Sequence, residues 1–148
     1  MRSILNEGDR AAVASRVRSL SETSIARWGS MDVASMLYHL HLSSRMALGE
    51  LPVPSVNKRA FQMFPLKHLL LYVLPFPKSA PTAPELKCSV SVSFEEERAA
   101  LLELLERIGT GPNEGEGPPH PLFGPMTYRE WGVVTYKHAD HHLRQFGA

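Results

Sequence analysis

Apolar residues recur at helical spacing in five segments of this chain, and connections rich in proline and glycine separate the segments. In the second segment, for example, Val33, Leu37 and Leu40 share one face of a helix. Alternation with a period of two, which is typical of strands, is almost absent. The pattern predicts an all-α chain in which an antiparallel bundle of four helices encloses one core, with a long crossover connection and one short extra helix. The five segments cover residues 9–20, 32–48, 57–74, 93–108 and 127–146.

Boundary signals agree with this division. Asp32 can cap the second segment, and Gly49 is placed to end it. The tetrads that begin at Ser93 and Thr127 both have the capping-box pattern, in which a hydroxyl residue precedes a glutamate by three positions. Pro65 removes a backbone donor and should kink or split the third segment. Residues 109–117 are rich in Gly, Pro and Glu and are expected to form a loop.

Composition narrows the class of protein. The 148 residues are 43% hydrophobic, which suits a single domain over residues 1–148 with one core. The 16 basic and 15 acidic residues nearly balance, so neither nucleic acid nor an anionic membrane is the expected partner. The single cysteine, Cys88, excludes an internal disulfide and a cysteine-based zinc cluster. Neither a secretory signal nor a membrane span is recognisable, which predicts a cytoplasmic protein.

Chemistry concentrates in the histidines, beginning with His138 and His142. Residues four apart stand on one face of a helix, where two imidazoles can converge on a metal ion. Asp140 points to the opposite side, and His141 is offset by about 100°, toward a rim or supporting position. The alternative is a solvated histidine cluster near a helix C-terminus. The pair, however, falls on the predicted buried face with Trp131, and two unpartnered imidazoles in a core would be costly to desolvate.

A further ligand can come from the second segment. His39 and His41 are two residues apart and therefore face in different directions, at opposite margins of the apolar stripe. Periodicity does not choose between them. For either histidine the alternative is a partly buried ring that bonds a carbonyl group.

Two other residues are candidates for a supporting or pocket position. His120 lies in a proline-rich loop before the last helix, where it can line a site or simply pack the loop. Gln145 follows His142 on the same helical face. Phosphate-binding glycine loops, a nucleophile elbow and the His-Glu-x-x-His zinc motif are all absent from the sequence.

Several of these features occur together in a known group of proteins. Trp28-Gly29, Met36-Leu37-Tyr38-His39-Leu40 and the stretch from His138 to Gly147 resemble the DinB-like superfamily. The stretch from His120 through Trp131-Gly132 to Gln145-Phe146 is similar to a branch known only as a domain of unknown function.

The resemblance implies a DinB-like four-helix bundle, usually dimeric, with one divalent transition metal ion (Zn, Ni or Fe) held by three histidines. Transferred by position, the ligands are His39, His138 and His142. The implied function is a metal-dependent transferase, isomerase or hydrolase that acts on a small molecule, in some members through a thiol. The alternative is a non-catalytic dimeric helical protein that binds a partner and whose histidines are structural or vestigial.

Self-association is also predicted from the third segment. Its large apolar residues cannot all face one core, so part of them should form an exposed patch that a second copy of the chain buries. The alternative is that the Pro75–Ser93 connection covers them. The residues concerned are Phe61, Phe64, Leu69, Leu70, Leu71, Tyr72, Val73 and Leu74.

Overall fold

Four long helices form the body of the computed structural model, which describes residues 1–56, 58–78, 84–86, 88 and 91–148. Within these residues the chain is all-helical and has no strand, only isolated bridges in the loop before the last helix. The predicted all-α class is confirmed. The long helices are α1 (Glu7–Ser19), α2 (Val33–Ala47), α4 (Phe94–Thr110) and α5 (Tyr128–Gln145).

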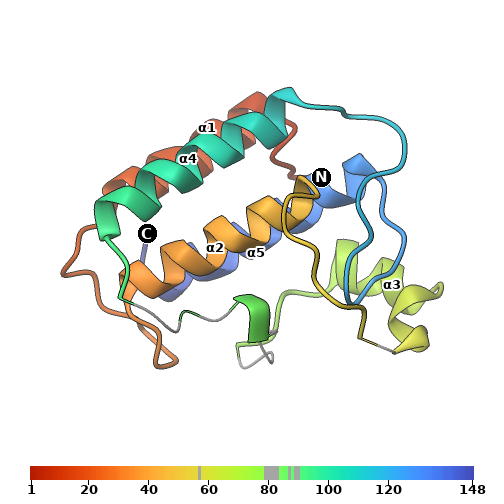
Figure 1. The fold of residues 1–148 in the computed structure, drawn as a ribbon, viewed down its shortest axis with the longest axis horizontal. Coiled ribbons are helices and arrows are strands. Elements are labelled where there is room, and N and C mark those ends of the chain that lie inside the picture. The colour runs from red at the N-terminus through yellow and green to blue at the C-terminus, as the bar shows by residue number, and fades with distance from the viewer. Residues whose placement is uncertain (57, 79–83, 87, 89–90) are drawn as a thin grey trace.

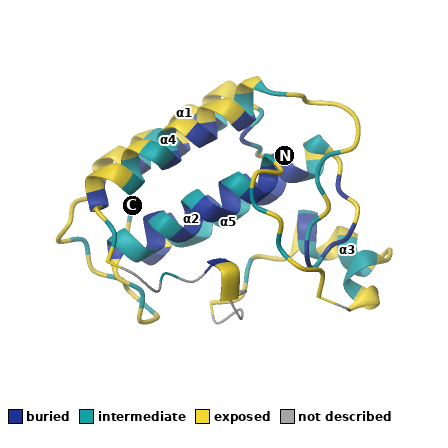
Figure 2. Ribbon diagram, in the orientation of Figure 1, coloured by how far each residue is buried: buried dark blue, intermediate teal, exposed yellow. Residues whose placement is uncertain are grey.

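The helices pack in two layers. Figure 1 shows α1 beside α4 and α2 beside α5, and contacts of α2 with α4 and of α1 with α5 join the layers. The buried sides of the helices turn toward one another, and their exposed sides face outward (Figure 2). Each long helix contributes residues that are almost completely buried, among them Val17, Leu37, Leu105 and Leu143. These apolar stripes supply the main driving force for packing, because burial removes their surface from water.

Helix starts follow the predicted caps. The side chains of Asp32, Ser93 and Thr127 each accept a backbone N–H from the first turn, and at Thr127 the capping box is complete. The first helix begins at Glu7 rather than near residue 9, because Asn6 provides the capping oxygen.

The predicted loop over residues 109–117 begins too early. Helix α4 continues through Gly109 to Thr110. Arg10 of α1 crosses directly over this glycine, where a Cβ atom would lie only 2.4 Å from the arginine Cδ. The Arg10 guanidinium is ion-paired with Glu106 of α4 at 2.9 Å. Gly109 therefore allows Arg10 to pack closely against α4, and it does not end the helix.

The third predicted helix is split, as expected from Pro65. Its parts are η1 (Arg59–Gln62), α3 (Leu66–His68) and η2 (Leu69–Val73, a π-helical turn), and Asn57 lies outside the described residues. The ammonium of Lys137 on α5 donates to the carbonyls of Leu70, Leu71 and Leu74, and so fixes the end of η2 to the body of the molecule.

The crossover that follows returns to the body at η3 (Pro84–Leu86), which packs against α2. Phe76, which precedes the gap in the described residues, packs against α5 next to Lys137 and His138. None of the helices in the described part of the chain combines the length and apolar character needed to cross a bilayer.

Candidate metal centre

Three imidazoles converge between α2 and α5. One ring nitrogen each of His39, His138 and His142 lies within 4.8 Å of those of the other two. The Nε2 atoms of His39 and His138 are 2.8 Å apart, and the ring centroids of the three histidines are 4.7–5.0 Å apart. The structure therefore brings together the three residues that were predicted as ligands.

The helices explain this placement. His138 and His142 stand one turn apart on the inner face of α5, next to the fully buried Leu143. His39 is 5% exposed and faces them from α2. Because the backbone positions of all three belong to packed helices, convergence costs little additional ordering.

Two of the three rings have a fixed hydrogen-bond direction. His39 Nδ1 lies 3.0 Å from the Leu86 carbonyl oxygen, which can only accept, so Nδ1 carries the proton. His142 Nδ1 lies 2.8 Å from Oε1 of Gln145. In both neutral rings the other nitrogen, Nε2, then keeps its lone pair. Carbonyl groups that hold the far nitrogen of a metal-binding histidine are a common arrangement around such sites.

The electrostatics favour neutral rings. Burial lowers the pKa of His39, partly offset by the Leu86 hydrogen bond. Burial and the two neighbouring imidazoles hold the pKa of His138 well below its usual range. Burial, assisted by His39, lowers the pKa of His142 to about 4. Neutral imidazole is the form that binds a metal ion, so the cluster requires no deprotonation at neutral pH.

One side of the cluster is bordered by aromatic rings. Phe76 lies 5.9 Å from His138 and 6.3 Å from His141, measured between ring centroids. His141 is only partly buried and makes edge contacts with His142 and with Trp28. Its pKa is lowered mainly by burial. His141 therefore lies at the rim of the cluster rather than within it.

The remaining sequence candidates lie elsewhere. His41 faces α4, where its Nδ1 donates to Glu97 at 2.5 Å. Asp140 faces away from the cluster and pairs with Arg16 at 2.7 Å. His68 is exposed on α3 and packs against Tyr72.

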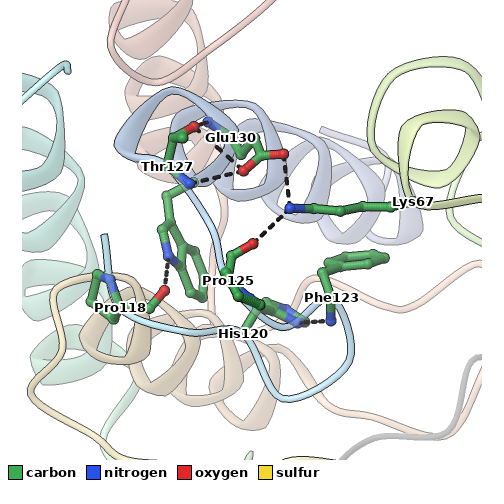
Figure 3. A network of polar contacts seen from close by, with 8 residues as sticks. Lys67, Pro118, His120, Phe123, Pro125, Thr127 and Glu130 are labelled. Carbon is green, nitrogen blue, oxygen red and sulfur yellow. Dashed lines mark hydrogen bonds and ion pairs between the residues drawn. The ribbon is translucent and has the colours of Figure 1, made fainter. Parts of the chain in front are cut away.

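His120 packs the loop that precedes α5 (Figure 3). Its Nδ1 accepts the backbone N–H groups of Leu122 and Phe123 at 3.1 and 3.3 Å. Beside it, Lys67 joins the Pro125 carbonyl to Glu130. The ring belongs to this loop network and is not part of the triad.

Sequence reasoning did not find Leu86, Trp28 or Phe76. The Leu86 carbonyl acts through the main chain, which carries no residue-type signature. So does the Trp28 carbonyl, which accepts from the side-chain amide of Gln145 at 2.8 Å. The one available signal is the Trp28-Gly29 pair, since Gly29 has a φ of +78° and marks a specific turn.

The donor set fits a transition metal. Three neutral imidazoles suit Zn, Ni or Fe, and three protein ligands leave coordination positions for water or a substrate.

A family model described as "Protein of unknown function (DUF1569)" matches residues 2–148. The chain belongs to this family. Neither a curated protein nor a solved structure matches it. For this member of the DUF1569 family, function therefore has to be argued from the chemistry of the site.

Proposed function

We propose that this chain binds one divalent transition metal ion (Zn, Ni or Fe) through His39, His138 and His142, and that its family is a branch of the DinB-like superfamily with an antiparallel four-helix bundle. The observation that carries the proposal is the convergence of three neutral imidazoles within 4.8 Å, with His39 buried and the other two rings at least partly buried. A core offers no reason to gather three such rings unless they share a partner, because each loses its hydration.

The positions of the imidazole protons support the proposed metal site. Since His39 Nδ1 donates to Leu86, the lone pair on His39 Nε2 accepts the Nε2 proton of His138 across 2.8 Å. An ion held by the Nε2 atoms of both rings would require the His138 proton to move from Nε2 to Nδ1, a change of tautomer that leaves the ring neutral. The metal-free arrangement is thus close to the bound one and would differ in the tautomer of one ring.

The enzymatic form of the proposal is a transferase, isomerase or hydrolase that acts on a small molecule, with a thiol as one candidate co-substrate. A metal ion with open positions supplies Lewis acidity and lowers the pKa of a bound water or thiol. The protein residues orient the three imidazoles, and Phe76 and Trp28 limit the access of water at the rim.

Metal analysis tests the proposal. Tag-free protein that has been equilibrated with Zn²⁺, Ni²⁺ or Fe²⁺ and then desalted should retain about one ion per chain. His39→Ala and His138→Ala should each lose the ion. His41→Ala, two residues from His39 but paired with Glu97, is the matched control and should retain it. A wild-type protein that retains no ion after this treatment would contradict the proposal.

A second candidate function rests on the exposed apolar residues of the 63–74 segment. Phe64 is 83% exposed, Met63 63% and Val73 62%, on a segment anchored to the body by Lys137. Such a patch favours a dimeric, partner-binding protein, in which a second copy covers these side chains. Light scattering at micromolar concentration should give a dimer mass, and Phe64→Ser together with Val73→Ser should give a monomer. A wild-type monomer would overturn this candidate without affecting the metal proposal.

A further inference from the structure

We propose that Gln145 is a positioning residue for the triad: held by the turn at residues 27–29, it selects the tautomer of His142 that presents the Nε2 lone pair. This inference rests on the proposed metal-binding function. It concerns a residue outside the three imidazoles and a turn that is remote in sequence.

The direction of each hydrogen bond follows from its partners. The carbonyl oxygen of Trp28 can only accept, so the atom of Gln145 that lies 2.8 Å from it must be the amide nitrogen. The amide oxygen is then turned to His142 Nδ1, also at 2.8 Å. An amide oxygen can only accept, so His142 Nδ1 must carry the proton. One main-chain carbonyl thereby determines where His142 keeps its lone pair.

The amide of Gln145 cannot reverse this order. Gln145 is 5% exposed, and its main-chain carbonyl accepts the backbone N–H of Arg27 at 2.7 Å. A flipped amide would place its oxygen against the Trp28 carbonyl oxygen, which can only accept. That contact would be repulsive in a site where water cannot replace the lost hydrogen bond.

Gly29 fits the same arrangement. Its φ of +78° lies in the left-handed region, and a Cβ atom at this position would lie 2.9 Å from the amide nitrogen of Gln145. A side chain at residue 29 would therefore push against the amide as well as strain the turn. The turn and Gln145 are complementary in shape, so the support of His142 extends from α5 into the loop between α1 and α2.

His39 and His142 differ in the group that accepts their Nδ1 proton. His39 is oriented by a main-chain carbonyl, that of Leu86, which no side-chain substitution removes. His142 is oriented by a side chain. Substitution of Gln145 can therefore change the tautomer of His142 while all three ligands remain.

The first test removes the amide. In metal-free wild-type protein at about pH 8, long-range ¹H–¹⁵N spectra of the histidine rings should show the Nδ1–H tautomer for His142. Gln145→Leu keeps a similar volume but offers no acceptor, so both tautomers become accessible and Zn²⁺ affinity should fall about 10- to 100-fold. Gln145→Glu keeps an oxygen that accepts from His142 Nδ1, but it places its other oxygen against the Trp28 carbonyl. This variant should therefore keep the His142 tautomer at a cost in stability, and its Zn²⁺ affinity should fall less than that of Gln145→Leu.

The second test reaches the amide through the turn. Gly29→Ala places a methyl group against Gln145 and should reproduce the mixed tautomers of Gln145→Leu. Gly115→Ala is the matched control, because Gly115 also has a positive φ, of +91°, but its side-chain position meets no atom within 4 Å. It should leave both the tautomer and the Zn²⁺ affinity unchanged. Gly29→Ala combined with Gln145→Leu should cost little more affinity than Gln145→Leu alone, because both substitutions act on one contact.

The outcomes separate this inference from the metal proposal. If the wild type binds no metal but His142 shows the Nδ1–H tautomer and Gln145→Leu loses it, the positioning role stands and the metal proposal fails. If the wild type binds Zn²⁺ and Gln145→Leu retains both the tautomer and the affinity, the positioning role is overturned alone. Equal effects of Gly29→Ala and Gly115→Ala would likewise overturn it, since they would reflect backbone strain only.

Discussion

His142 and His120 are two partly buried imidazoles with similarly lowered pKa values and opposite hydrogen bonding. Burial lowers the pKa of each to about 4. His142 donates from Nδ1 to Gln145, whereas His120 accepts two backbone N–H groups at Nδ1. The lone pair of His120 Nδ1 is therefore used by its own loop. Burial and a low pKa do not by themselves identify a metal ligand. A candidate ligand is identified by a nitrogen lone pair that is directed toward other ligand atoms.

The surroundings of His120 and of the triad also differ in their hydrogen bonding. The His120 ring contacts those of Phe123 and Trp131, with centroid distances of 4.7 and 5.2 Å, and Trp131 itself donates to the Pro118 carbonyl. His120 Nδ1, Trp131 Nε1 and the Lys67 ammonium all make hydrogen bonds to main-chain groups of this loop (Figure 3). In the triad, the Nε2 atoms of His39 and His138 are hydrogen-bonded to each other rather than to a loop. A loop network stabilises a fold, and a triad with a shared proton can take up a cation.

The largest expected difference between the two histidines is in metal affinity. His142→Ala removes a ligand, so Zn²⁺ affinity should fall by more than about 100-fold, the upper limit for losing a mere supporting contact. His120→Ala should leave it within a few fold. Isothermal titration calorimetry on both variants measures the difference. Comparable losses in the two variants would show that the loop takes part in the site.

The histidines could be predicted to different extents. The His138–His142 pair follows from spacing, because residues four apart meet on one face of any helix. His39 and His41 could not be separated by periodicity, since both lie at margins of the same stripe. Tertiary partners distinguish them: α5 lies at one margin, and Glu97 of α4 lies at the other.

The fold shows the same division between local and distant causes. The caps at Asp32 and Thr127 and the break at Pro65 act locally, and the sequence revealed them. The continuation of α4 through Gly109 depends on Arg10, nearly a hundred residues away in the chain, so no local pattern could indicate it. The carbonyls of Leu86 and Trp28 were unpredictable for the same reason, because their role depends on where the loops return.

The second prediction concerns stability without metal. His120→Ala leaves two backbone N–H groups without their acceptor and should lower the free energy of unfolding by about 2–3 kcal/mol in urea titrations with a chelator. His120→Asn retains an acceptor oxygen for the same N–H groups, as in an Asx turn, and should recover most of the loss. Added Zn²⁺ at about 100 times Kd should stabilise the wild type and both variants alike, by about 2.7 kcal/mol. An equal loss for Ala and Asn would assign the effect to ring packing instead.

The third prediction uses what the two histidines share. Each has a folded-state pKa below its unfolded value of about 6.5, so the unfolded chain binds more protons between pH 6.5 and 4. Their contribution to stability is therefore complete above about pH 6.5 and is lost as the pH falls, by about 1.4 kcal/mol per pH unit for each group. In metal-free protein, His120→Asn and His142→Asn should each make the decline less steep by a similar amount. A decline that only one of them changes would mean that the two rings are not electrostatically alike.

The smallest effect is expected at His41. Its ring is hydrogen-bonded to a carboxylate, whereas the ring of His39 is hydrogen-bonded to another histidine. His41 lies two residues from His39, but its Nδ1 donates to Glu97 between α2 and α4, and both side chains are partly exposed. An ion pair or hydrogen bond in that position contributes about 1 kcal/mol or less, because solvent competes for both partners. His41→Ala should therefore lower the free energy of unfolding by about 1 kcal/mol and leave Zn²⁺ affinity within about threefold of the wild type, since it touches no triad member. Glu97→Gln, which keeps an acceptor for the His41 N–H, should have a smaller effect on stability than His41→Ala. If His41→Ala instead reduced metal affinity as strongly as His39→Ala, α2 would have to present its other face to α5, and the triad would contain the wrong histidine.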